Sequence, residues 1–318
     1  MKVLVAGGSG FVGSRLVELL IARGHEVRIY DLVVKAQFAD ITVRGDVREL
    51  EPYAAAAAGY DAIINLAAVH RDDVQPVELY HTTNVDGARV TAEVAALDDI
   101  RRIVFTSSVA VYGLDKPPSR ETDPTDPFNP YSVSKLAAEQ AYRAWYDGAP
   151  GRVLQIVRPS VIFGENNRGN VYTLARQIRS GRFLTVGNGR NRKSMAYVGN
   201  VVEFLAEMLE NGQGYRLLNY ADKPDMSTNE LVNTVKKALG RNPKLSIHLP
   251  LWLGMLGGHC FDLLAKLLRR ELPISAIRVK KFAAETVVDT TALEATGFIR
   301  PFTIAEGLRR TIAAEFGS

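Results

Sequence analysis

The sequence predicts an α/β protein built on a doubly wound parallel sheet, with a smaller α/β domain interleaved toward its C-terminus. Short apolar runs typical of strands alternate with amphipathic helical patterns through the first half of the chain, as in parallel βαβ units. A glycine-rich turn joins the first of these runs to the first helical pattern. The alternation weakens after about residue 160, where glycine-rich segments such as "GENNRGN" appear, and this change indicates a second domain.

The chain opens with a strand, a turn and a helix. Residues 3–5 have the composition of a strand that is buried on both faces, and the apolar residues after Phe11 follow a helical period. Three glycines lie in the turn between them: Gly7 permits the tight turn, Gly10 lets the backbone approach a ligand, and Gly13 allows close packing of the helix. The N-terminus of that helix can then hold an anion.

The remaining elements of the first domain follow the same alternation. Further strands are predicted at residues 26–31, 41–45, 61–66, 101–107 and 152–157. We expect a dinucleotide-binding Rossmann domain over residues 1–160 and a mainly substrate-binding domain over residues 161–318. Residues 194–200 and 215–220 also have strand character, so some segments of the second domain are expected to return to the sheet.

Composition indicates an ordinary soluble protein. Of the 318 residues, 47% are apolar and 23% are charged. The single cysteine, Cys260, cannot form an internal disulfide bond, so we expect a cytoplasmic protein. The apolar run after Lys2 is interrupted at once by glycines, which argues against a signal peptide. No metal site is predicted.

Basic residues are concentrated in one segment, although the whole chain has only 39 basic against 35 acidic residues. This segment contains no acid and seven basic residues, which are Arg168, Arg176, Arg179, Arg182, Arg190, Arg192 and Lys193. It is compatible with a solvated helix face, with a bound diphosphate or with nucleic acid. Nucleic acid is not predicted, because no zinc finger, aromatic-basic platform or basic helix accompanies the segment.

Residues 249–268 form the most apolar stretch of the chain. Pro250, three glycines, His259, Asp262 and Lys266 make it unsuitable for spanning a bilayer, so no transmembrane segment is predicted. We favour ordinary packing inside the second domain, with an amphipathic helix lying on a membrane surface as the alternative. Five basic residues would support that alternative: Arg269, Arg270, Arg278, Lys280 and Lys281.

A carboxylate ends the second predicted strand. Asp31 can accept hydrogen bonds from both hydroxyls of an adenosine ribose and would repel a 2′-phosphate, so NAD is favoured over NADP. Lys35 lies nearby and leaves NADP as the less favoured cofactor. Asp46, after the third strand, could reach the adenine amino group.

A tyrosine and a lysine share the first turns of a predicted helix. Asn129 is a good N-cap and Pro130 a good first helical residue, so Tyr131 should lie in the first turn. Lys135 is then one turn further on the same face. An ammonium beside a phenol lowers the phenol pKa from about 10, which suits proton exchange with an alcohol.

Two serines complete this set. Ser107 and Ser108 lie at the carboxyl end of the strand predicted at residues 101–107, and ligands bind at the carboxyl ends of parallel strands. A serine hydroxyl at this place can hold a substrate oxygen opposite Tyr131. The constellation therefore indicates proton transfer to or from an alcohol beside a dinucleotide.

With these motifs in order, the chain resembles the extended short-chain dehydrogenase/reductase family, and within it the NAD-dependent nucleotide-sugar epimerases and reductases. The resemblance covers nearly the full length. It rests on "GGSGFVG" (7–13), "GDV" (45–47), "NLAA" (65–68), "NVDGARVTAEVA" (84–95), "SSVAVYG" (107–113), "YSVSK" (131–135), "RPSVIFG" (158–164) and "LEATGF" (293–298).

The resemblance implies a role for each matching residue. Ser108, Tyr131 and Lys135 fall on the catalytic serine, tyrosine and lysine of the family, and Lys135 would also hold the nicotinamide ribose. Phe11 and Val12 would offer backbone amides to the pyrophosphate. The other residues implied around the cofactor are Asp46, Val47, Leu66, Ala67, Ala68, Ser107, Pro159, Ser160 and Val161.

Departures from the family pattern narrow the reaction. Related 4,6-dehydratases carry Asp-Glu after the hydroxyl residue, where this chain has Val109 and Ala110, so dehydration is not expected. Hydride transfer at a single carbon remains, either as 4-epimerisation through a transient ketone or as reduction of a 4-keto sugar. A hydroxysteroid-type or other small-alcohol dehydrogenase, and a non-catalytic NAD-binding sensor, are the alternatives.

The second domain carries the residues implied for the substrate. Asn170 matches the family asparagine that meets the substrate diphosphate, and Lys193 stands where many relatives have an arginine, with Arg192 beside it. The resemblance thus implies a nucleoside-diphosphate sugar as substrate. It also implies a homodimer, formed through helices at residues 76–97 and 130–146.

Overall fold

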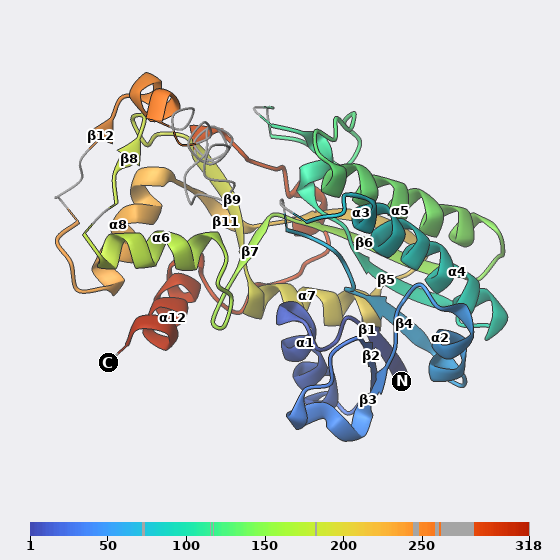
Figure 1. The fold of residues 1–318 in the computed structure, drawn as a ribbon. Helices are drawn as coiled ribbons and strands as arrows, with labels where there is room; N and C mark the ends of the chain where they lie inside the picture. The colour runs from blue at the N-terminus through green and yellow to red at the C-terminus, as the bar shows by residue number, and fades with distance from the viewer. Residues whose placement is uncertain are drawn as a thin grey trace.

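The computed structural model describes residues 1–71, 74–114, 116, 118–181, 183–243, 248–257, 261 and 283–317. Figure 1 shows a central sheet covered by helices on both faces and, beside it, a second group of smaller elements. Several residues named from the sequence lie outside the described ranges. They are Arg182, His259, Cys260, Asp262, Lys266 and the basic residues Arg269, Arg270, Arg278, Lys280 and Lys281, so the apolar stretch 249–268 is described only at residues 249–257 and 261.

The central sheet has seven strands, and every neighbouring pair is parallel. In spatial order the strands are β10 (Tyr215–Tyr220), β6 (Val153–Pro159), β5 (Arg102–Thr106), β4 (Ala62–Asn65), β1 (Lys2–Ala6), β2 (Glu26–Asp31) and β3 (Thr42–Arg44). The direction of winding reverses between β1 and β4, and ligands of such sheets bind outside that point. The predicted doubly wound α/β fold is confirmed.

Helices cover both faces of this sheet (Figure 1). One face carries α1 (Phe11–Ala22) and α7 (Val198–Asn211), and the other carries α2 (Leu50–Ala57), α4 (Gly87–Leu97) and α5 (Pro130–Asp147). The core divides accordingly into two large clusters of buried side chains. The strands contribute to both clusters because successive side chains of a strand point to opposite faces.

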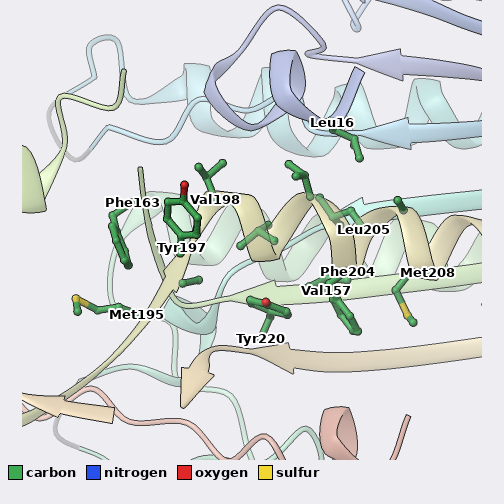
Figure 2. Packing of buried hydrophobic residues seen from close by; sticks show 14 of the residues in the cluster. Leu16, Val157, Phe163, Met195, Tyr197, Val198, Phe204, Leu205, Met208 and Tyr220 are labelled. Atoms are coloured by element: carbon green, nitrogen blue, oxygen red, sulfur yellow. The ribbon is translucent and has the colours of Figure 1, made fainter. Parts of the chain in front are cut away.

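Aromatic and aliphatic side chains of α7 form the centre of one cluster. Phe204 of this helix packs on Tyr220 of β10 with 5.0 Å between ring centroids, beside Val157 of β6 (Figure 2). Leu16 of α1 lies on the other side of α7. All four side chains are almost fully buried, so α7 packs against both the sheet and its neighbour α1.

The helix predicted over residues 76–97 is interrupted. The structure has α3 (Glu78–His81), a π-helical turn η2 (Thr82–Asp86) and then α4. Two 3-10 helices complete this half of the chain, η1 (Ala36–Ile41) and η3 (Val109–Tyr112). The single turn α11 (Thr291–Glu294), from the far end of the sequence, contacts β10 of the central sheet. Periodicity alone did not show the break at η2, whose cause lies in the site described below.

Among the described residues, the second group of elements contains two small sheets, the three labelled helices named below and a helical segment at residues 251–257. β11 (Asp222–Ser227), β9 (Arg192–Tyr197) and β7 (Val161–Phe163) form one sheet, and β12 (His248–Leu249) pairs with β8 (Thr185–Val186) in the other. The helices are α6 (Asn170–Arg179), α8 (Thr228–Ala238) and α12 (Ile304–Phe316). No helix among the described residues is long and apolar enough to cross a membrane.

Candidate active site

The glycine turn is packed against the segment that follows β4. Gly7 has a φ of +77°, and a Cβ on it would lie 2.6 Å from the backbone nitrogen of Ala67 and 2.8 Å from the carbonyl carbon of Leu66. A Cβ on Gly13 would likewise collide with the carbonyl oxygen of Gly7, so the helix packs on the turn itself. Neither position has room for a side chain.

Gly10 faces open space. A Cβ on it would meet only the Gly7 carbonyl oxygen, at 3.1 Å, with no other atom within 4 Å apart from its chain neighbours. Gly10 is the N-cap of α1, and it offers no side-chain cap to the first amides of that helix. This cradle fits the pyrophosphate of a dinucleotide, because backbone amides at a helix N-terminus hold anions.

Asp31 ends β2 beside this cradle. Its Oδ2 accepts a hydrogen bond of 3.0 Å from the backbone N–H of Ser9, and its Oδ1 accepts one of 3.0 Å from Val33. Each carboxylate oxygen retains a second lone pair for a ribose hydroxyl. Lys35 directs its ammonium to the Ser14 hydroxyl at 2.7 Å, which turns it toward α1.

We expect Asp31→Ala to weaken NAD binding about tenfold or more while leaving NADP binding nearly unchanged. The variant loses the acceptor for the ribose hydroxyls, and such bonds to a charged group contribute about 1.5–3 kcal/mol each, but it also removes the repulsion of a 2′-phosphate. Isothermal titration with both cofactors measures this selectivity. Asp31→Asn keeps the size of the side chain and one acceptor oxygen for the turn amides, and it serves as the control for local collapse. Equal losses for the two cofactors would show that Asp31 does not contact the ribose.

Local chemistry positions the predicted tyrosine and lysine as the sequence indicated. The Asn129 side chain accepts a hydrogen bond of 2.8 Å from the backbone N–H of Ser132, and the Ser132 hydroxyl accepts one from Asn129 in return. Pro130 is the first residue of α5, so Tyr131 lies in its first turn. Lys135 follows one turn later on the same side of the helix.

Lys135 reaches the carboxyl end of β5. Its Nζ donates a hydrogen bond of 2.8 Å to the carbonyl oxygen of Thr106, the last residue of that strand. Ser108 leaves the strand two residues later, and its hydroxyl accepts a hydrogen bond of 3.2 Å from Ala110. The structure thus brings the end of β5 and the start of α5 together, with Ser108, Tyr131 and Lys135 on those two segments.

The Lys135 ammonium is fully buried. Its surroundings lower its pKa to about 7, because burial disfavours the charged form, while the Glu139 carboxylate raises the pKa in part. The ring of Phe105 lies 4.8 Å from the ammonium nitrogen. A lysine with this pKa can gain or lose a proton near neutral pH, and in its charged form it favours the phenolate of a neighbouring tyrosine.

A buried ion pair supports this end of the sheet, and the sequence interpretation missed it. Arg158 of β6 donates to both carboxylate oxygens of Glu139 on α5, from Nε at 2.8 Å and from Nη2 at 2.6 Å. The Ser107 hydroxyl also donates to Glu139. Glu139 stands four residues after Lys135, so helical spacing could have placed it beside the site.

The same arginine extends the network to β10, at the edge of the central sheet. Arg158 Nη1 donates to the Tyr112 hydroxyl at 2.7 Å, and this hydroxyl donates to Asn219 Oδ1 at 2.8 Å. Asn219 belongs to β10, and its amide donates to the carbonyl oxygens of Ser119 and Asp289. The network therefore joins β6, η3 and β10 beneath the site with hydrogen bonds among buried groups.

Asn84 is a further residue that the sequence interpretation missed. Its amide donates to the Ser134 hydroxyl at 2.8 Å and to the Val69 carbonyl at 2.9 Å, and its oxygen accepts from the Val69 N–H at 2.8 Å. The Ser134 hydroxyl in turn donates to the Tyr131 carbonyl oxygen. Asn84 lies in the π-helical turn, so this turn ties the loop after β4 to α5.

Other predicted cofactor residues lie along the same edge. Leu66, Ala67 and Ala68 follow β4, Ser107 follows β5, and Pro159, Ser160 and Val161 lie where β6 passes into β7. The Ser160 hydroxyl oxygen is buried and has no hydrogen-bond partner within the described ranges. Phe11 and Val12 begin α1. These positions fit a dinucleotide across the edge, and the individual contacts stay predictions.

Asp46 and Val47 are engaged with protein groups. The Asp46 carboxylate accepts hydrogen bonds from Arg48, at 2.9 and 3.0 Å from Nε and at 3.0 Å from the backbone N–H, and these hold its pKa below the usual value. Val47 is buried against Gly87 of α4. Contact of Asp46 with adenine remains a prediction.

The predicted substrate residues begin two elements of the second group. Asn170 is the exposed first residue of α6. Arg192 and Lys193 start β9, where Arg192 donates to the Asp225 carbonyl at 2.7 Å and Lys193 donates to the Ala284 carbonyl at 3.0 Å. Their binding to a diphosphate stays a prediction.

Known proteins are similar to this chain in sequence. The sequence profile described as the NAD dependent epimerase/dehydratase family matches residues 3–221. The chain is 49% identical to the N-acetyl-alpha-D-glucosaminyl-diphospho-ditrans,octacis-undecaprenol 4-epimerase of Escherichia coli O157:H7, with 99% of this chain and 95% of the relative covered. It is 25% identical to a UDP-glucose 4-epimerase of Vibrio cholerae over 98% of this chain and 95% of that relative.

Solved structures show the same fold. The NAD complex of the Thermus thermophilus UDP-glucose 4-epimerase superposes with a TM-score of 0.77 at 23% identity, and all of both chains is covered. The predictions of an NAD cofactor and of an epimerase or oxidoreductase activity are confirmed by these relatives. The chain therefore belongs to the NAD dependent epimerase/dehydratase family, as an enzyme of the extended short-chain dehydrogenase/reductase type.

Proposed function

We propose that this enzyme is a 4-epimerase whose substrate is N-acetylglucosamine joined through a diphosphate to a polyprenol. The observation that carries the proposal is the 49% identity, over 99% of the chain, to the Escherichia coli O157:H7 enzyme that acts on such a lipid-linked sugar. The Vibrio cholerae UDP-glucose 4-epimerase reaches only 25% over a similar span. Lipid-linked and nucleotide-linked substrates share the sugar diphosphate, and they differ in whether a polyprenol or a nucleoside is attached to it.

The proposed reaction uses the groups at the end of β5 and at the start of α5. When bound, NAD would accept the hydride from C4 of the sugar and later return it to the same carbon. Tyr131, as phenolate, accepts the proton of the 4-hydroxyl as the C4–H bond breaks, and a ketone forms at C4. The Ser108 hydroxyl donates a hydrogen bond to the same oxygen. Lys135 in its charged form would favour the phenolate form of Tyr131.

Epimerisation requires the ketone to present its opposite face before the hydride returns. Tyr131 then gives its proton back to the same oxygen, so one residue serves both halves of the reaction. No carboxyl side chain follows Ser108, where Val109 and Ala110 stand, and this supports epimerisation rather than loss of water. The cofactor is regenerated in each turnover.

Binding of the diphosphate would fall to Asn170, Arg192 and Lys193. Residues 168–193 contain no acid, so the electrostatic field of this segment favours an anion. Lys193 would act as a point charge, without the two-pronged geometry of an arginine. We also propose a cytoplasmic homodimer that pairs through α4 and α5.

The purified enzyme with NAD should interconvert the gluco and galacto epimers of N-acetylhexosaminyl-diphospho-undecaprenol in detergent. Chromatography of the sugars released from the lipid measures conversion from both directions, and both should reach the same ratio. Absorbance of reduced nicotinamide should show no net change, since the hydride returns to the sugar. The control substrate is UDP-N-acetylglucosamine, for which we expect a lower kcat/KM. Preference for the nucleotide, or stoichiometric use of reduced cofactor, would contradict the proposal.

A further inference from the structure

A short helix beyond β12 presents an apolar face to solvent. Residues 251–257 are helical, and the side chains of Leu251, Trp252 and Leu256 are 46%, 66% and 56% exposed. Helical geometry places these three within about 140° of one another around the axis. Large apolar side chains grouped on one exposed face typically mark a contact surface, whereas single ones do not.

The opposite side of this helix is anchored to the protein. Gly254 is buried, and a Cβ on it would lie 2.5 Å from Cγ1 of Val186 in β8. The preceding strand is fixed as well, since the Gly187 N–H donates to the Leu249 carbonyl at 2.8 Å. Packing inside the domain, the arrangement favoured from the sequence, thus accounts for the Gly254 side, and the other face is not covered by the part of the chain that the structure describes.

The segments that form this surface carry basic side chains and no acidic ones. Residues 183–193 and 248–257, which form the face and the strand pair beneath it, contain no aspartate or glutamate. Arg190 is exposed and follows Gly187 on the loop that leaves β8. Hydrogen bonds from Ser227 lower the pKa of the Glu230 carboxyl, and the charge of the nearby Arg192 adds to this effect. Because Arg192 is partly neutralised by this carboxylate, we assign the positive edge to Arg190 alone.

We infer that Leu251, Trp252, Leu256 and Arg190 form a surface that docks on an anionic lipid bilayer. Tryptophan is enriched at the interface between membrane and water, and leucines beside an arginine are typical of helices that lie in the plane of that interface. This inference rests on the proposed function, because a polyprenol chain keeps its sugar diphosphate at the membrane surface. Three large apolar side chains and one arginine provide weak, reversible binding.

The position of this surface suits such a substrate. The loop that carries Arg190 leads from β8 directly into β9, which begins with Arg192 and Lys193. Figure 1 shows β8 and β12 at the end of the molecule farthest from β3. A lipid held by the bilayer at this end could therefore extend its diphosphate toward the start of β9.

Vesicle flotation tests the surface directly. Without substrate, the wild-type protein should float with vesicles of phosphatidylethanolamine and phosphatidylglycerol at low salt. The variant Leu251→Ser/Trp252→Ser/Leu256→Ser should bind at least about tenfold more weakly, since it loses the apolar anchor. Arg190→Gln should bind about fivefold more weakly at low salt only, because its contribution is electrostatic. Trp252→Ser alone is the variant to use if the triple change impairs folding.

Exposed apolar residues elsewhere provide the matched controls. Leu97 and Ile299 are 65% and 84% exposed, and Leu97→Ser and Ile299→Ser should float as the wild-type protein does. Failure of the wild-type protein to float, or undiminished flotation of the triple variant, would overturn the inference. Light scattering gives a further outcome that would overturn it. If the wild type does not float and the triple variant has a different oligomeric state from the wild type, the face joins two copies of the chain instead.

Turnover assays separate this inference from the proposed substrate. The triple variant should keep its kcat on a water-soluble sugar diphosphate with a short prenyl chain, and its KM should rise only for the undecaprenyl substrate in vesicles. Flotation without turnover of any lipid-linked sugar would leave the docking surface standing and refute the substrate. Turnover in detergent without flotation would refute the docking surface alone.

Discussion

Tyr131→Phe is expected to lower kcat by about 10²–10⁴-fold while leaving NAD affinity nearly unchanged. The variant keeps the ring and the first turn of α5 but removes the hydroxyl that exchanges a proton with the sugar, and general acid–base catalysis contributes about that factor. Steady-state turnover of the sugar measures kcat, and titration with NAD measures binding. The effect should fall on kcat more than on KM, because proton transfer belongs to the chemical step.

Tyr146→Phe is the matched control for this experiment. Tyr146 lies on the same helix, and its ring packs against Tyr215 of β10 with 5.7 Å between centroids, far along α5 from Tyr131. This change removes the same atom from the same element and should leave kcat within about twofold. If Tyr131→Phe turned over sugar as fast as Tyr146→Phe, another group would have to be the acid and base.

The fold was predictable where it depends on local pattern. The apolar runs of β1, β2, β4, β5 and β6 are visible in the sequence because strands of parallel sheets are buried on both faces. Residues 215–220 also have strand character, but their pairing with β6 in the main sheet depends on contacts between distant segments. Residues 194–197 have the same character and pair with β7 in another sheet. Local sequence does not distinguish these two outcomes.

The site divides in the same way. The N-cap Asn129 and the four-residue spacing from Tyr131 to Lys135 are local, so the sequence predicts where both side chains begin. The π-helical turn at η2 is formed where Asn84 makes bonds to the distant Val69 and Ser134, which hydrophobic periodicity does not reveal. Arg158 and Glu139 are separated by 19 residues, and only the folded chain shows that they form a buried pair.

The largest loss of stability should come from breaking that pair. Glu139→Gln leaves the guanidinium of Arg158 buried without its counter-charge, where both side chains of the ion pair are less than one-tenth exposed. Removal of one partner of a buried pair costs about 3–5 kcal/mol in the free energy of unfolding. Urea unfolding followed by fluorescence and circular dichroism measures the change. Asp147→Asn, which breaks the exposed Arg143–Asp147 pair on the same helix, is the control and should have little effect.

A second substitution distinguishes the cost of the orphaned charge from the value of the pair. In Glu139→Gln/Arg158→Met neither position carries a charge, so the desolvation cost of the lone guanidinium disappears and part of the stability should return. Complete recovery is not expected, because the Tyr112 hydroxyl loses the donor at 2.7 Å that links it to β6. If the double variant were less stable than Glu139→Gln, the guanidinium would stabilise this region without its carboxylate, and the orphaned charge could not be the cause of the loss.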